Sequence, residues 1–242
     1  MNIAFFHSGA DTSLPTMFCK SARLTFGKGC NLVQISDDAT PQVSDVDKVY
    51  RANEVDMDYP MLTRMRAYRD LLFDYKEPIA FFDTDILIVR PFHLNLDEKR
   101  PILCRRTFSQ DAPLNTIFRN ILGEVINFPE HSGLTIGSAY PFVGCFFADK
   151  NEHFLDKALA IYAELDRKYW KWFGDQVALR DASVDHLFLE VAESTIACLP
   201  EHIRDYEDVA GIHFKGNRKA AMNDFFVELI ERTSADKSLI HG

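Results

Sequence analysis

Short apolar runs alternate along the chain with longer segments whose apolar residues recur at helical spacing. The runs are too short for helices and are rich in Ile, Val and Phe, which is typical of buried strands in a mostly parallel sheet. We therefore expect an α/β fold with a mixed, mostly parallel, Rossmann-like sheet flanked by helices. The expected strands are residues 3–6, 31–35, 46–52, 78–82, 86–89, 101–105, 141–148 and 195–199.

The helical segments complete a β-α-β beginning of the kind found in doubly wound nucleotide-binding domains. We expect helices at residues 13–26, 60–75, 151–172, 174–179 and 220–231, and a short one near 114–122. Residues 107–140 are otherwise irregular and could cover a site, and residues 212–219 read as a basic loop. Without a convincing linker or repeat, residues 1–242 are expected to form a single domain.

The most unusual stretch is Asp83-Thr84-Asp85, which places two carboxylates between two apolar runs. Both side chains are expected at or just past the carboxyl end of a strand, on the same side of it. Two like charges this close favour a compensating cation, and hard oxygen ligands suit Mg²⁺ or Mn²⁺. A polar turn between two strands, with both Asp side chains in water, explains the tripeptide alone equally well.

Composition narrows the function classes. The chain has 242 residues, 47% of them apolar, and a formal net charge of -9, which argues against a general nucleic-acid surface. Its 5 cysteines form no CxxC pair and are expected to be reduced core thiols. No secretory leader, apolar run of membrane-spanning length, G-x-G-x-x-G or Walker motif occurs. We expect a cytoplasmic protein without a transmembrane segment, for which peripheral membrane association stays open.

Three other polar segments could serve the Asp pair. Arg66 lies on the helix that leads into it, Asp175-Gln176 begins a later helix, and His213 to Lys219 is a basic loop containing Gly216. An imidazole ligand, a close backbone approach and an ammonium group are suited to a metal-bound diphosphate. Taken singly, each has an ordinary interpretation as surface charge or helix capping.

In their order along the chain, these segments resemble the GT-A fold glycosyltransferases, and within them the glycosyltransferase family 8 pattern of glycogenin-like and lipopolysaccharide galactosyl- or glucosyltransferases. The residues before and within Asp83-Thr84-Asp85 are similar to the family's "YLDaD" strand end. Asp175-Gln176 resembles its "DQdaLN" segment, and the loop from His213 matches "HxxGxxKPW" at His, Gly and Lys.

The resemblance implies a role for each matched residue. Asp83, Asp85 and His213 would hold Mn²⁺ or Mg²⁺, and Asp175 and Gln176 would border the transferred sugar as the catalytic residues. The donor would contact the residues His7, Ser8, Arg66, Asp83, Thr84, Gly144, Gly216 and Lys219. His7 and Ser8 stand where the family has its base-gripping loop, and Gly144 stands in its sugar-contacting strand.

The implied reaction moves a sugar from a nucleotide-diphosphate donor, a UDP-hexose, to a hydroxyl of a glycan or other acceptor. The resemblance implies retention of configuration and a place in bacterial surface polysaccharide synthesis. If the reaction inverts, Asp175 is the candidate general base. Two alternatives stay open: a haloacid-dehalogenase-type phosphatase using Asp83 and Asp85, and a module that binds nucleotide sugars without catalysis.

Overall fold

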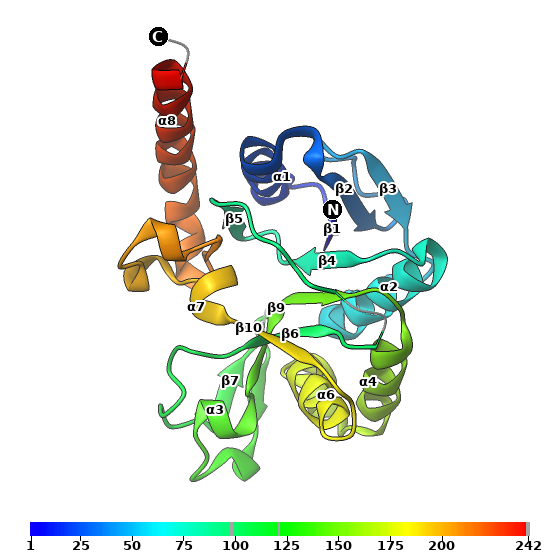
Figure 1. Ribbon diagram of the computed structural model, residues 1–242. Helices are drawn as coiled ribbons and strands as arrows, with labels where there is room; N and C mark the ends of the chain where they lie inside the picture. Colours follow the sequence, from blue (N-terminus) through cyan, green and yellow to red (C-terminus); the bar gives the residue numbers. More distant parts are fainter. Residues whose placement is uncertain (97–98, 121, 241–242) are drawn as a thin grey trace.

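The computed structural model describes residues 1–96, 99–120 and 122–240 of the chain. A seven-stranded sheet lies at its centre, with neighbouring strands in the order β10-β6-β9-β4-β1-β2-β3 (Figure 1). The strands of this sheet are β1 (Asn2–Phe6), β2 (Asn31–Ser36), β3 (Lys48–Arg51), β4 (Ile79–Phe82), β6 (Ile102–Arg105), β9 (Phe142–Asp149) and β10 (Leu189–Ala192).

The sheet is mixed and mostly parallel, as the sequence predicts. β1 pairs in parallel with both β2 and β4, β2 pairs in parallel with β3, and β10 pairs in parallel with β6. β9 alone among these strands runs the other way, antiparallel to both β4 and β6. The carboxyl ends of β1, β2, β4 and β6 therefore meet the beginning of β9 at one edge of the sheet.

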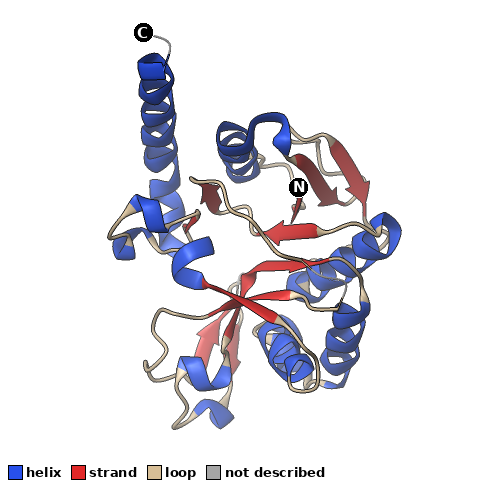
Figure 2. Ribbon diagram, in the orientation of Figure 1, coloured by secondary structure: helices blue, strands red, loops and turns tan. Residues whose placement is uncertain are grey.

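Helices cover both faces of the sheet (Figure 2). α2 (Pro60–Tyr75), α4 (His153–Glu164) and α6 (Gly174–Ser183) pack on one another and on one face, where Phe81 points. α1 (Ser13–Phe26) lies against the other face, where the next residue, Phe82, points. This alternation follows from the two-residue period of a strand and explains why β4 is apolar throughout.

A second, two-stranded ladder lies beside the main sheet. β5 (Ile86–Ile88) pairs antiparallel with β11 (Gly211–His213), which brings the chain near residue 213 back to the end of β4. Two further elements follow β11: a 3₁₀ helix at Gly216–Ala221 and α8 (Met222–Ile240). The expected basic loop at 212–219 is therefore partly a strand and partly a helix.

The predicted strands through 141–148 are confirmed, but three other assignments are wrong. Residues 195–199 are not a strand: α7 (Glu193–Ile196) ends within this segment, and the strand β10 lies just before α7. The buried Glu193 carboxylate accepts hydrogen bonds from the backbone N–H groups of Thr107 (3.1 Å) and Phe108 (3.2 Å), which fixes the turn into α7.

The expected helix near 114–122 is instead a hairpin of β7 (Ile117–Arg119) and β8 (Val125–Asn127), and residue 121 lies outside the described part. Asn120 Oδ1 accepts from the backbone N–H groups of Leu122 (3.0 Å) and Glu124 (2.9 Å), and Gly123 has a φ of 82°. This turn chemistry outweighs the helical spacing of the apolar residues before it. A short α3 (Ile136–Ala139) follows.

The expected single helix at 151–172 is broken into α4 and α5 (Arg167–Lys171). The break occurs at Asp166, whose Oδ1 accepts from the backbone N–H of Lys168 at 3.0 Å and so caps a new helix. At the C-terminus, α8 begins and ends later than the expected 220–231 and extends away from the sheet (Figure 1).

Within the described residues, no helix combines the length and the apolar character needed to cross a membrane. The five cysteines are all buried and free of disulfides, as expected of core thiols.

Candidate active site

The Asp pair lies where β4 leaves the sheet. β4 ends at Phe82, and the backbone N–H of Asp83 still donates to the carbonyl of Cys145 on β9 at 2.9 Å. Thr84 and Asp85 complete the turn, and β5 begins at the next residue. The Asp83 side chain is 27% exposed and that of Asp85 is 10% exposed, so both carboxylates are largely removed from water.

The ladder of β11 and β5 brings His213 to this turn. The backbone N–H of Phe214 donates to the carbonyl of Asp85 at 2.8 Å, and His213 Nε2 lies 3.3 Å from Asp85 Oδ1. Asp83, Asp85 and His213 each offer one ligand atom, and these atoms all lie within 4.8 Å of one another. Residues far apart in sequence thus form one compact group of two oxygens and one nitrogen.

The chemistry of this group fits a divalent cation. Asp85 Oδ1 is buried and accepts no well-directed hydrogen bond from the residues that the structure describes, despite its short distance to His213. A buried carboxylate oxygen without a donor is costly, and a cation would satisfy it. Carboxylate oxygens with one imidazole are ligands that Mn²⁺ and Mg²⁺ accept.

Burial and neighbouring charges shift the pKa values of all three side chains. Burial raises the pKa of Asp83, and the Asp85 carboxylate raises it further, against the opposing effect of Arg64. Burial also acts to raise the pKa of Asp85, but His213 and Lys219 outweigh it and hold this pKa below its usual range. Burial disfavours protonated His213, whereas Cys145 and Asp85 favour it and raise its pKa to about 10.

Lys219 reaches the same carboxylate from the other side. Its Nζ lies 3.2 Å from Asp85 Oδ2. The 3₁₀ helix that carries Lys219 begins at Gly216, whose φ of 66° is a conformation that glycine adopts without strain. Gly216 therefore lets the chain turn back so that an ammonium group faces the Asp pair.

Arg64 on α2 joins the Asp pair to Asp175 on α6. Its Nη1 is ion-paired with Asp83 Oδ1, and its Nη2 lies 2.8 Å from Asp175 Oδ2. Gly144 on β9 leaves room for this contact: a Cβ at position 144 would lie 3.0 Å from Arg64 Nη2 and would collide with Asp175 Oδ2. Arg64 thus brings Asp175 and Gly144 next to the Asp pair.

The neighbouring Gln176 is held by a residue that the sequence interpretation did not identify. Arg106, just after β6, donates from Nη2 to Gln176 Oε1 at 2.7 Å. Its backbone N–H donates to the carbonyl of Pro141 at 2.8 Å, at the beginning of β9.

His7 and Ser8 lie at the same edge of the sheet, just after β1. The His7 backbone N–H donates to Ile35 on β2 at 2.9 Å, and Ser8 Oγ donates to Asp37 Oδ2 at 2.6 Å. Burial lowers the pKa of His7, and its Nε2 is covered and has no hydrogen-bond partner among the described residues. These residues line the end of β1 and β2 rather than the metal group.

The structure does not bring Arg66 to the Asp pair. Its Nη1 lies 4.0 Å from Glu54 Oε2, and its side chain is 47% exposed. Arg64, two residues earlier, takes the place between the carboxylates. A signal for Arg64 is present in the sequence, because it precedes Tyr68 by four residues and follows Met61 by three, on the apolar stripe of α2.

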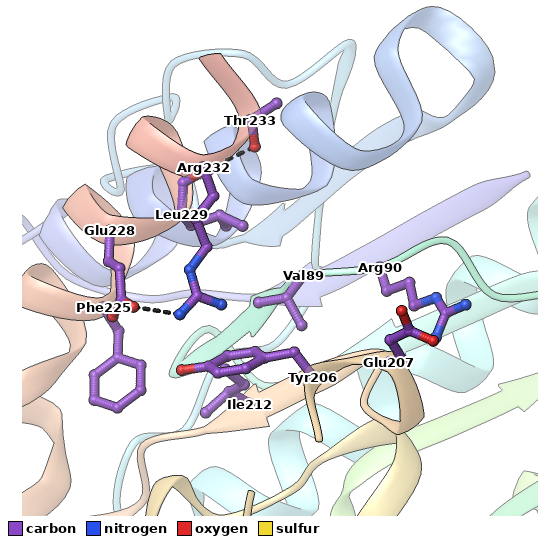
Figure 3. Close-up of a pocket in the computed structure, with 10 residues that line it drawn as sticks. All are labelled: Val89, Arg90, Tyr206, Glu207, Ile212, Phe225, Glu228, Leu229, Arg232 and Thr233. Carbon is purple, nitrogen blue, oxygen red and sulfur yellow. Dashed lines mark hydrogen bonds and ion pairs between the residues drawn. The ribbon is translucent and has the colours of Figure 1, made fainter. Parts of the chain in front are cut away.

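A separate cavity of about 320 Å³ lies under α8 (Figure 3). Ile212 lines it, so it lies on the opposite side of β11 from the next residue, His213. Tyr206, Phe225 and Leu229 form its apolar walls, and Arg232 crosses it, with its guanidinium 4.2 Å from the Tyr206 ring centroid. None of the candidate site residues lies in this cavity.

No known protein-family model matches this sequence, and no curated protein matches it either. Solved structures do match. The galactosyltransferase LgtC, solved in complex with donor and acceptor sugar analogs, superposes with a TM-score of 0.59 at 12% identity, covering 95% of each chain. An active-site mutant of LgtC superposes with a TM-score of 0.54 at 10% identity, covering 96% of each chain.

The glycosyltransferase GlyE of Streptococcus pneumoniae TIGR4, in its apo form, superposes with a TM-score of 0.59 at 11% identity over 97% of this chain. The chain spans 63% of the length of GlyE. Together with the mixed sheet and its edge, these superpositions confirm the predicted architecture. The chain has the GT-A fold of the glycosyltransferase structures on which it superposes.

Proposed function

We propose that this protein is a glycosyltransferase that moves a hexose from a UDP-sugar to an acceptor hydroxyl, with retention of configuration. The observation that carries the proposal is the grouping of Asp83, Asp85 and His213 within 4.8 Å, beside Lys219. The GT-A fold supports the same reaction class by analogy.

Asp83, Asp85 and His213 are the residues that would hold Mn²⁺ or Mg²⁺. When bound, the cation supplies Lewis-acid neutralisation of the charge that develops on the departing diphosphate. His213 must release its proton to act as a ligand, because the imidazole nitrogen that binds a metal has to be unprotonated.

Lys219 supplies a second positive charge for the leaving group. It now pairs with Asp85 Oδ2, and its side chain is 48% exposed, so it can move to a phosphate oxygen once a cation neutralises the Asp85 carboxylate in its place. Gly216, with no side chain, allows the backbone to approach the diphosphate.

Asp175 and Gln176 are the proposed catalytic residues. Arg64 holds the Asp175 carboxylate against Gly144, next to the metal group. In this position the carboxylate stabilises the oxocarbenium-like sugar, while the Gln176 side chain, held by Arg106, contacts the reacting sugar. His7 and Ser8, at the ends of β1 and β2, are the proposed contacts for the nucleoside, and Thr84 lies between the two metal ligands.

The test is sugar release from a panel of UDP-hexoses, followed with and without Mn²⁺. We expect release that depends on added Mn²⁺ and that Asp85→Asn and His213→Ala each abolish, while both variants keep the wild-type melting temperature within a few degrees. Full activity in excess EDTA would exclude the metal assignment.

The phosphatase alternative is not favoured, because the chain has the fold of glycosyltransferase structures. Hydrolysis of p-nitrophenyl phosphate that depends on Asp83 would reverse this. Metal-dependent UDP binding without any sugar release from the panel would instead support a binding module.

A further inference from the structure

Arg106 is a buried cation whose charge is not matched by a carboxylate. It is 9% exposed. Its Nε donates to the carbonyl oxygen of Tyr140 at 2.8 Å and its Nη2 to Gln176 Oε1 at 2.7 Å, and both of these acceptors are neutral. In the part of the chain that the structure describes, no ion pair involves Arg106. A buried charge without a counter-ion is costly, which makes an anionic ligand a favourable partner.

The third guanidinium nitrogen of Arg106 is available for such a ligand. Nη1 makes no hydrogen bond to the described residues, and these residues do not cover it fully. It therefore keeps accessible surface. Because Nε and Nη2 are fixed by Tyr140 and Gln176, this open nitrogen is held in place rather than free to move with a flexible side chain.

The position of Arg106 distinguishes it from the cations that would serve the diphosphate. Lys219 contacts Asp85, and Arg64 links Asp83 to Asp175. Arg106 instead contacts Gln176, the residue that follows Asp175. The charge of Arg106 is thus linked to one of the residues proposed to border the sugar, and not to the carboxylates that Lys219 and Arg64 contact.

Resting on the proposed function, we propose that Arg106 binds a carboxylate carried by a sugar in this site, so that the enzyme uses an acidic sugar. The irregular segment that begins at Thr107 favours the acceptor as its source, because acceptor contacts come from loops. The backbone of Arg106 is itself tied to that segment, since Gln110 Nε2 donates to its carbonyl oxygen at 2.5 Å.

The direct test is calorimetric binding of methyl glucuronide and methyl glucoside to the protein with UDP and Mn²⁺ present. A charge-assisted contact predicts that the glucuronide binds about 10- to 100-fold more tightly than the glucoside. Arg106→Gln is expected to remove this difference, and Arg106→Lys, which keeps the charge, to retain part of it. Arg105→Gln is the matched control, because Arg105 pairs with Glu190 on the surface.

The proposal is overturned if the wild-type protein binds the two glycosides equally and also shows no preference between UDP-glucuronic acid and UDP-glucose, whether or not the variants fold. A parallel comparison of UDP-glucuronic acid with UDP-glucose as donors identifies the source of the carboxylate: an Arg106-dependent preference on the donor side places it there instead of on the acceptor. Absence of sugar release from any donor would refute the proposed transfer reaction, while the binding comparison would still decide the role of Arg106.

Discussion

Arg64 Nη2 lies 2.8 Å from Asp175 Oδ2, and the same guanidinium is paired with Asp83 through its other terminal nitrogen. One cation thus connects the turn after β4 with the beginning of α6, which are far apart in sequence. The consequence is that the proposed metal group and the proposed catalytic carboxylate have a fixed relative position before any donor binds, and such preorganisation favours the transition state.

We expect Arg64→Gln to reduce the rate of sugar release by about 100-fold, the scale seen when one preorganised electrostatic contact is removed. The family resemblance instead assigns the donor contact to Arg66, which is half exposed and lies near Glu54. Kinetics of Arg64→Gln and Arg66→Gln side by side distinguish the two. A large loss in Arg66→Gln with a near-normal Arg64→Gln would contradict the role inferred from the geometry.

Gly144→Ala tests the close approach at β9. The added methyl group would collide with Asp175 Oδ2 and lie 3.0 Å from Arg64 Nη2, so the ion pair must move. We expect at least a tenfold loss of kcat from such a misplacement. Gly29→Ala is the matched control, because a Cβ there meets nothing within 4 Å and its φ is not positive. Equal kcat values in the two variants would show that the packing at Gly144 does not matter.

Lys219→Met removes the ammonium group that faces Asp85. We expect the donor KM to rise about tenfold or more, since one charge-assisted contact to the diphosphate is lost. The control is the adjacent Arg218→Gln, because Arg218 pairs with Glu201 on the surface and exposed pairs contribute about 0–1 kcal/mol. An unchanged KM in Lys219→Met, measured at saturating Mn²⁺, would remove Lys219 from the donor site.

Asp149, at the end of β9, predicts a pH dependence of stability. It is 1% exposed, and burial raises its pKa to about 6 from 3.8. The folded protein therefore binds this proton more tightly than the unfolded chain does, so the associated stability is present below about pH 4 and is lost as the pH rises through 6.

Asp149→Asn should therefore raise the free energy of unfolding relative to wild type by about 1–3 kcal/mol at pH 8 and by little at pH 4. Urea titrations at both pH values measure this, with the largely exposed Asp185→Asn as a control. A gain of the same size at both pH values would rule out the titration of Asp149 as its cause.

The hydrophobic pattern of the sequence correctly predicted one group of strands and helices. Two-residue and helical periods identify β1, β2, β4, β9, α1 and α2, because these elements bury continuous apolar faces. The same reasoning failed where a single polar contact decides the backbone. Asn120 makes a hairpin of a segment with helical spacing, Asp166 begins a new helix, and Glu193 fixes α7 through contacts to Thr107 and Phe108, which are far away in sequence.

The residues of the candidate site also could be recognised only in part from the sequence. Asp83 and Asp85 could be recognised from their place between apolar runs, and the structure brings His213, Lys219 and Asp175 to them. The spacing of Arg64 on α2 carries a sequence signal, but the sequence shows no partner for Arg64 or Arg106. An arginine on a partly apolar helix or after a strand is usually a surface residue, and only tertiary packing shows what it contacts. The extent of the single domain and the individual roles of the site residues stay predictions.

The most direct test of the account is electron paramagnetic resonance of Mn²⁺ titrated into the protein with and without UDP. We predict one bound Mn²⁺ per chain, tighter when UDP is present, and loss of this binding in Asp85→Asn with the fold retained. Mn²⁺ binding that is the same in Asp85→Asn, or no Mn²⁺ binding even with UDP, would contradict the proposal that Asp83, Asp85 and His213 form the metal centre of a nucleotide-sugar enzyme.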